Sequence, residues 1–313
     1  MLQSEEESAK ETPCDFTSGD WVPDKWGPLY NGTTCSTIKE GQNCIAHGRP
    51  DMGYLYWRWK PKHCNLPRNQ LESLLCMLAS ASAPKLVYRD GKDNKFRRWR
   101  FDSQNITISV YWSPFLVKGV EKSNAGPNHN KLYLDHVDER WAADMNDLTC
   151  LCYQLGIGLK DYSQDSNREG GRVTNGKGID VIVTTFSPSH FEGEWDKFGA
   201  CPKTEPYQEG EKSLEGMDAE MRKIEIEEIE AAKLSAIQFD NLRLEALDVT
   251  KLSLMRPDGH PGPYMYPFPF ANGVTERVQN DCVHWCLPGP IDTWNEILLE
   301  LIKGWEYQSI KEE

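Results

Sequence analysis

The sequence predicts an α/β layer fold for the C-terminal two-thirds of the chain, preceded by a small cysteine-rich module. Segment 179–186 (IDVIVTTF) is an almost continuous β-branched run, which is typical of a buried strand in a parallel sheet. Predicted strands and helices alternate around it, as they do in α/β layers. Five of the ten cysteines fall within the first 76 residues, among Gly, Pro and Trp, and these mark out the module.

The first half of the chain contains the module and a series of short elements. Frequent Gly, Pro and Asp in residues 14–64 favour turns and short strands over helices. Residues 69–80 place four leucines at helical spacing and predict a helix. Strands are expected next at 86–90, 95–102 and 106–117, the last two joined by a polar turn.

The second half alternates between strands and long helices. A charged helix is expected at 214–239, and its acidic run Glu225–Glu230 is interpreted as a solvated face. A further strand is expected at 243–249. A final amphipathic helix at 291–307 leaves residues 308–313 as a tail.

Charge and hydropathy exclude two classes of partner. The 35 basic and 48 acidic residues give a net charge of −13, and a polyanion repels phosphate backbones, so no nucleic-acid partner is expected. No apolar run approaches the ~18 residues that a transmembrane helix needs. The first 13 residues are acidic and polar, unlike a signal peptide, and we expect them to be a disordered stem remnant.

The cysteines and two sequons nevertheless indicate a secretory compartment. Because no two of the first five cysteines have CxxC spacing, the pattern favours disulfides over zinc, and we expect no metal site. Asn31 and Asn105 begin Asn-x-Thr sequons for N-glycosylation. We therefore expect a lumenal protein whose membrane anchor is missing from this chain.

Asp281 and His284 are the strongest candidates for chemistry, within NDCVHWCLPG at 280–289. A spacing of three lets both side chains point the same way, and an Asp beside a His stabilises the imidazolium that forms when the His acts as a general base. The alternative is a disulfide-stapled structural turn with a surface histidine. The loop 256–261 (RPDGHP) also offers a second base or a metal pair, or is simply a structured loop.

Six blocks carry a resemblance to a known family: CDFTSGDWVPD, YWRWKP, RNQLESLLCML, FSPSHFEGEWD, RPDGHPGPY and DCVHWCLPGPIDTWNEILLE. In these blocks the chain resembles the plant trichome-birefringence-like family, Golgi polysaccharide O-acetyltransferases with a PC-esterase domain. The resemblance implies an SGNH/GDSL-esterase-like three-layer fold over 65–307, with a parallel sheet between helices. It also implies acetyl transfer to a hemicellulose (xylan, xyloglucan or mannan) through an acetyl-serine, no bound cofactor, an unidentified acetyl donor and a type II membrane anchor.

The resemblance assigns catalytic roles to Asp281 and His284, which match the family's Asp-x-x-His pair. The family's Gly-Asp-Ser nucleophile block has no counterpart, because Arg68 runs directly into Asn69 and Gly-Asp-Ser occurs nowhere in the sequence. One core strand is expected to be lost with it. Ser73 corresponds to an additional helix serine and is not expected to replace the nucleophile. A second departure follows Asp147, in a stretch that leaves the pairing of its two cysteines open.

Further assignments follow from the same resemblance. Asn69, Ser189 and His190 are expected to line the cleft. The expected disulfides are Cys14–Cys64, Cys35–Cys76, Cys44–Cys286 and Cys201–Cys282. The function implied is O-acetylation of a hemicellulose, with this chain impaired by its missing serine. The alternative is a non-catalytic relative that binds wall polysaccharide or a protein partner.

Overall fold

A parallel sheet lies at the centre of the C-terminal part of the chain. The computed structural model describes residues 14–28, 30–35, 37–66, 84–90, 96–103, 105–111, 117–120, 122, 126–143, 150–154, 179–238, 242–274 and 277–312. Within them, strands β8 (Cys150–Gln154), β9 (Ile179–Thr184) and β10 (Leu242–Leu247) form a sheet in the order β10-β9-β8. Both pairings are parallel, which confirms the prediction from the β-branched run.

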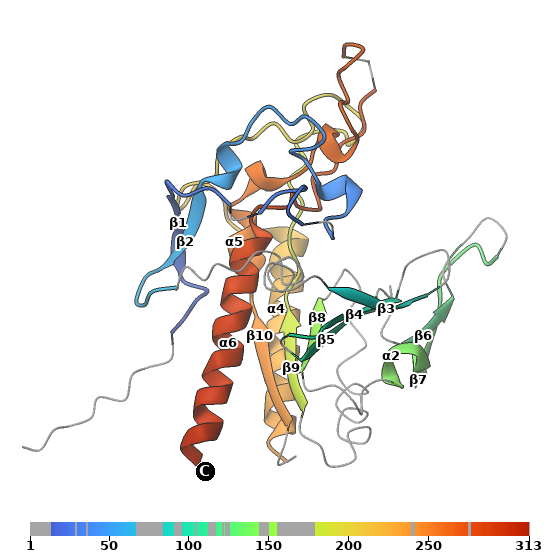
Figure 1. Cartoon of the computed structure of the whole chain (residues 1–313), viewed down its shortest axis with the longest axis vertical. Coiled ribbons are helices and arrows are strands. Elements are labelled where there is room, and N and C mark those ends of the chain that lie inside the picture. Colours follow the sequence, from blue (N-terminus) through green and yellow to red (C-terminus); the bar gives the residue numbers. More distant parts are fainter. Residues whose placement is uncertain are drawn as a thin grey trace, which may run out of the picture.

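Two long helices accompany this sheet, and Figure 1 shows β10 running between them. Helix α4 (Gly216–Ala236) packs along β10, and α6 (Ile291–Glu312) contributes Trp294, Ile297 and Leu298 to the main core. Helix α6 extends beyond the expected end at 307, because residues 305–312 contain no Gly or Pro to stop it.

The sequence predicts that the acidic run of α4 is a solvated face, but the structure buries one of its glutamates. Glu225 is only 3% exposed, and its Oε2 accepts a hydrogen bond from the backbone N–H of Phe186 at 3.0 Å. Burial raises the pKa of Glu225 to about 7. The helical period therefore turns one member of the run toward the end of β9, while Glu227 and Glu230 are exposed.

Antiparallel strands account for the middle of the chain. Strands β3 (Lys85–Arg89), β4 (Phe96–Phe101) and β5 (Ile106–Tyr111) form one sheet, and β6 (Val117–Val120) pairs with β7 (Lys131–Val137). The short helix α2 (Glu139–Ala142) follows β7. The predicted strands at 86–90, 95–102 and 106–117 correspond to β3, β4 and β5, whereas the helix expected at 69–80 lies outside the described residues.

The N-terminal module packs on the same core as the sheet. Its hairpin joins β1 (Gly19–Pro23) to β2 (Trp57–Pro61), and the 3₁₀ turns η1 (Glu40–Gln42) and η2 (Gly53–Leu55) lie between them. Trp21 donates its indole N–H to the carbonyl of Leu252 at 3.0 Å, across 231 residues of sequence. Because Trp21 and Trp59 share one buried cluster with Trp285, the module stabilises the loop that carries the candidate site.

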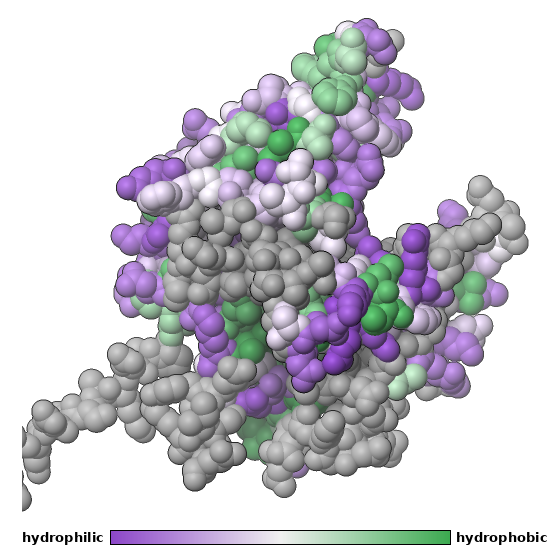
Figure 2. Space-filling model, viewed as in Figure 1, coloured by the Kyte–Doolittle hydropathy of each residue, from purple (hydrophilic) through white to green (hydrophobic). Residues whose placement is uncertain are grey.

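Short elements after β10 complete this region. Helix α5 (Thr250–Leu254) begins three residues after β10, and the 3₁₀ turns η4 (Pro257–Gly259) and η5 (Pro263–Met265) follow it. Beyond η5 the chain forms a protruding loop, visible at the top of Figure 1. Apolar side chains gather at that end of the molecule, with Phe268 and Val274 each 61% exposed (Figure 2).

Candidate active site

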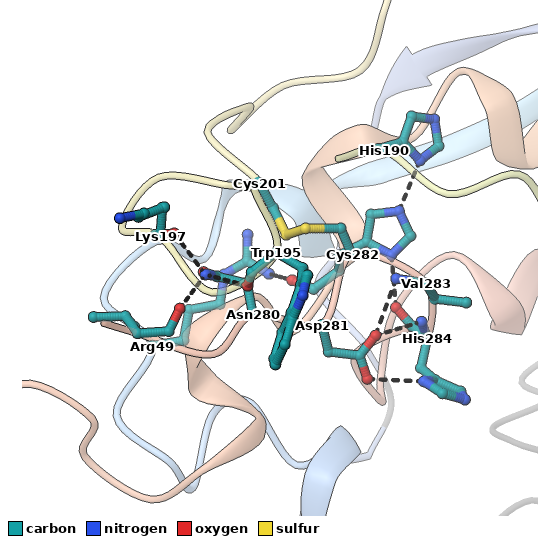
Figure 3. The surroundings of a disulfide bond; sticks show 12 residues. Arg49, His190, Trp195, Lys197, Cys201, Asn280, Asp281, Cys282, Val283 and His284 are labelled. Carbon is teal, nitrogen blue, oxygen red and sulfur yellow. Dashed lines mark hydrogen bonds and ion pairs between the residues drawn. A yellow bond between two sulfur atoms is a disulfide. The ribbon is translucent and has the colours of Figure 1, made fainter. Parts of the chain in front are cut away.

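The loop that carries Asp281 and His284 is anchored by a disulfide on either side. Cys201–Cys282 spans 81 residues of sequence and adjoins Asp281 (Figure 3). Cys44–Cys286 spans 242 residues and connects the far side of the loop to the N-terminal module. The loop conformation is therefore fixed by covalent bonds to two separate parts of the chain.

Backbone hydrogen bonds hold the same loop against the segment that follows α5. Gly262 and Asp281 exchange two of them, with N···O distances of 2.8 and 3.0 Å. The N–H of Cys286 also donates to the carbonyl of Gly259 at 2.9 Å. A Cβ on Gly259 would lie 2.4 Å from the ring of Pro290, so this close approach requires glycine.

The structure contains three of the four expected disulfides: Cys14–Cys64, Cys44–Cys286 and Cys201–Cys282. Cys35 is disulfide-bonded, and its expected partner, Cys76, lies outside the described residues. Cys150 begins β8 and is half-buried.

Asp281 holds both the backbone and the ring of His284. Its Oδ1 accepts hydrogen bonds from the N–H groups of Val283 at 3.0 Å and His284 at 2.8 Å. Its Oδ2 lies 2.8 Å from His284 Nδ1. The carboxylate side chain is 14% exposed, whereas the imidazole is 70% exposed. This arrangement fixes the Nδ1–H tautomer and leaves Nε2 available to take a proton from an incoming group.

The electrostatics suit a general base. Burial raises the pKa of Asp281, but its hydrogen bonds from His284 and Val283 outweigh burial and lower that pKa to about 2. The hydrogen bond to Asp281 raises the pKa of His284, against the opposing effect of burial. Asp281 therefore stays ionised at neutral pH and stabilises the imidazolium that forms when His284 accepts a proton.

We expect Asp281→Asn to lower the pKa of His284 by about one pH unit, because the neutral amide no longer stabilises the imidazolium. Titration of the His284 ring by NMR measures this change directly. Val283→Ala is the matched control in the same loop, because Val283 contributes only its backbone N–H to Asp281. An unchanged His284 pKa in Asp281→Asn would show that the carboxylate does not act on the ring.

The residues that were expected to line the cleft differ in their exposure. Ser189 is exposed in the loop after β9. His190 is only 8% exposed, and its Nδ1 lies 2.7 Å from His260 Nε2, so its place in a cleft stays a prediction. Asn69 and Ser73 lie outside the described residues. Among the described residues, no serine hydroxyl is hydrogen-bonded to His284.

The sequence did not predict the contacts that three residues make around the site: His260, Trp195 and Asn280. His260 lies 2.7 Å from His190, although the two are 70 positions apart. Trp195 is 55% exposed, and Asn280 holds its carbonyl with an N–H···O distance of 3.1 Å (Figure 3). In the sequence, Trp195 could be noticed only as part of the block GEWD, and the distance between this block and Asp281 along the chain does not predict that they lie close together.

Within the described part of the chain, no group of three or more His, Cys, Asp or Glu side chains could hold a metal ion. Arg256 and Asp258 from the RPDGHP loop instead form a buried ion pair, with an Nε–Oδ1 distance of 2.8 Å. That loop is therefore structured by internal pairing. The described helices also include none that is long and apolar enough to cross a membrane.

Comparison with known sequences identifies the family. Residues 65–156 and 166–301 match PC-Esterase, described as the GDSL/SGNH-like Acyl-Esterase family found in Pmr5 and Cas1p, and residues 12–65 match the PMR5 N terminal Domain. The chain belongs to the PC-esterase family. Membership confirms the resemblance seen in the sequence and the GDSL/SGNH-like α/β fold. The loss of a core strand stays a prediction.

Several relatives in the PC-esterase family are named as acetyltransferases. The chain is 63% identical to xyloglucan O-acetyltransferase 1 of Populus trichocarpa, over 97% of this chain and 85% of that protein. It is 51% identical to xyloglucan O-acetyltransferase 1 of Arabidopsis thaliana, over 94% and 81% of the two chains. Protein trichome birefringence-like 25 of Arabidopsis thaliana is 36% identical, over 95% and 78%.

The length of the match to the poplar protein shows that this chain lacks segments that the relative has. It extends over 366 positions, whereas this chain has 313 residues in all, so at least 53 positions of the poplar protein have no counterpart here. The family match also skips residues 157–165, inside the stretch that departs from the family pattern after Asp147. The chain therefore retains the family's overall sequence while lacking internal segments that this relative has.

Proposed function

We propose that this protein derives from a hemicellulose O-acetyltransferase and retains the acid–base half of its active site without the serine nucleophile. The observation that carries the proposal is the hydrogen bond between Asp281 and His284, on a doubly disulfide-anchored loop, in a chain 63% identical to a xyloglucan O-acetyltransferase. The names of three relatives that are 51% to 63% identical favour xyloglucan over xylan and mannan as the acceptor polymer.

In an intact relative, the chemistry would proceed as a double displacement. The serine oxygen attacks the carbonyl carbon of the acetyl donor while the histidine takes the serine proton, and the donor's leaving group departs with that proton. A sugar hydroxyl then attacks the acetyl-serine, loses its proton to the same histidine, and becomes the acetyl ester as the serine is regenerated. His284 would supply the base in both steps, and general base catalysis contributes about 10² to 10⁴ in rate.

This chain lacks the serine that makes the first attack in the double displacement. The sequence contains no Gly-Asp-Ser, and Arg68 is followed directly by Asn69. The missing segment would also have supplied an oxyanion-hole amide, and the loss of one such donor costs about 10² to 10³ in rate. We therefore infer that this chain is catalytically impaired.

The second candidate is a non-catalytic relative that binds wall polysaccharide. Exposed aromatic side chains near the anchored loop favour it, namely Trp195 and Phe198, which is 62% exposed. The two candidates differ in the gene. Sequencing the gene and its transcripts around codons 68–69 distinguishes them, because an excised exon that encodes Gly-Asp-Ser supports the enzyme. A gene without such an exon supports the binding protein.

The proposed location is the Golgi lumen. Three disulfides and two exposed sequon asparagines support an oxidising secretory compartment. After expression in a secretory host, we expect Asn31 and Asn105 to carry N-glycans, seen as a mass decrease on enzymatic deglycosylation. Unmodified asparagines at both positions would contradict passage through this compartment.

A further inference from the structure

Two buried histidines lie directly behind the Asp281–His284 loop. His190 Nδ1 and His260 Nε2 are 2.7 Å apart, and the two residues are 8% and 3% exposed. His190 comes from the loop after β9, and its backbone N–H donates to the carbonyl of Cys282 at 3.0 Å. His260 follows η4, and its ring stacks on Trp285 with centroids 4.1 Å apart. The catalytic chemistry described above uses neither ring.

The two outer nitrogens of the pair face backbone carbonyls. His190 Nε2 lies 2.8 Å from the carbonyl oxygen of Leu254. His260 Nδ1 lies 2.6 Å from the carbonyl oxygen of His284. A carbonyl oxygen only accepts hydrogen bonds, so each outer nitrogen must carry a proton.

The central contact adds a third requirement. Two ring nitrogens at 2.7 Å attract each other only when one proton lies between them, because two lone pairs at that distance repel. The three contacts therefore need three ring protons. Two neutral imidazoles have only two, so the pair must take up one more to make all three hydrogen bonds.

We infer that His190 and His260 share a proton as a singly charged pair, and that this pair is a positioning element that fixes His284 through its backbone carbonyl. The importance of this positioning for catalysis rests on the proposed function. The shared proton itself does not, because it follows from the geometry of the three contacts.

The surroundings both oppose and support the extra charge. Burial lowers the pKa of both rings. Charged groups that act on the pair through space include Asp258, Asp218 and Lys212 for His190, and Asp281 and Arg49 for His260. The three carboxylates favour the charged pair, and the two cations oppose it. The face of Trp285 adds a favourable contact with a cation.

Because some of these groups favour the charged pair and others oppose it, the hydrogen bond from His260 to the carbonyl of His284 should depend on pH. While three protons are present, all three hydrogen bonds form. When the pair loses a proton as the pH rises, one bond must break, and the carbonyl of His284 then loses its donor or the two rings separate. The loop would still be held by its disulfides, so the expected change is local to His284.

Counting ring protons tests the inference on the unmodified chain. In protein labelled with ¹⁵N-histidine, at about pH 5, below the ordinary histidine pKa because burial lowers the pKa of both rings, we expect three protonated ring nitrogens for His190 and His260 together. Signals are assigned by their loss in single variants. Two protonated nitrogens, one per ring, would overturn the shared proton whether or not the protein transfers acetyl groups.

His190→Gln tests whether the charge of the pair acts on His284. The glutamine amide carries no charge and can donate to the unprotonated Nε2 of a neutral His260, which then still donates from Nδ1 to His284. Because a nearby positive charge is removed, we expect the pKa of His284 to rise by about half a pH unit or more. Tyr207→Phe is the matched control, because its ring lies 6.3 Å from His190 and carries no part of the proton count. An unchanged His284 pKa in His190→Gln would overturn the coupling.

Discussion

Insertion of a relative's Gly-Asp-Ser segment between Arg68 and Asn69, together with the block missing after Asp147, should raise acetyl transfer to xyloglucan oligosaccharides by about 10³-fold or more. The size follows from enzymes of this kind, in which the loss of the nucleophile costs at least that factor. The inserted serine would gain a base already oriented by Asp281, at an N–O distance of 2.8 Å. Mass spectrometry of the oligosaccharides detects each acetyl addition.

Three controls define the restored activity. The same insertion with Ala in place of the nucleophilic serine should return transfer to background, and so should His284→Ala in the restored chain. Ser189→Ala should leave the activity unchanged, because Ser189 is exposed after β9 and is not needed by the proposed route. Transfer that survives either of the first two changes would contradict the acetyl-serine route.

Arg256→Met should lower the free energy of unfolding by about 3–5 kcal/mol, the usual cost of breaking a buried ion pair. Arg256 and Asp258 are each 1% exposed and form two hydrogen bonds, of 2.8 and 2.9 Å. Arg256 also donates to the carbonyl of Tyr54 at 2.7 Å and packs over the ring of Trp21. The substitution leaves Asp258 charged and unpaired, which is the main cost. Urea unfolding followed by tryptophan fluorescence measures the change.

Lys223→Met is the control for an exposed ion pair. Lys223 and Glu227 lie 3.7 Å apart with side chains 72% and 63% exposed, so its loss should change stability by no more than about 0.5 kcal/mol. The double variant Arg256→Met/Asp258→Asn should recover part of the loss, since no uncompensated charge remains. A loss below about 1 kcal/mol in Arg256→Met would show that this pair does not stabilise the join between the module and the core.

The local elements of the fold were accessible from the sequence. The β-branched run at 179–186 predicted a parallel strand, and β9 pairs in parallel on both sides. Helical periodicity located α4 and α6 to within a few residues. Periodicity did not reveal that Glu225 is buried, because its burial depends on the backbone N–H of Phe186, which the fold brings to it.

The candidate site was accessible only in part. A spacing of three residues was enough to bring Asp281 and His284 together, because both belong to one tight loop. The contact between His190 and His260 joins two loops that are 70 residues apart, and no periodicity encodes it. The disulfide pairing likewise came from resemblance, since cysteine positions alone leave many pairings open. Long-range contacts of these kinds depend on tertiary packing.

The most direct test compares the chain as written with its Asp281→Ala/His284→Ala variant, both expressed in a secretory host and incubated with acetyl donor and xyloglucan oligosaccharides. Single acetyl additions are counted by mass spectrometry of the products. We expect equal, background transfer from both proteins, because His284 has no nucleophile to activate. Acetyl transfer by the unmodified chain that disappears in the double variant would contradict this account, and Ser73 would then be the first nucleophile to test.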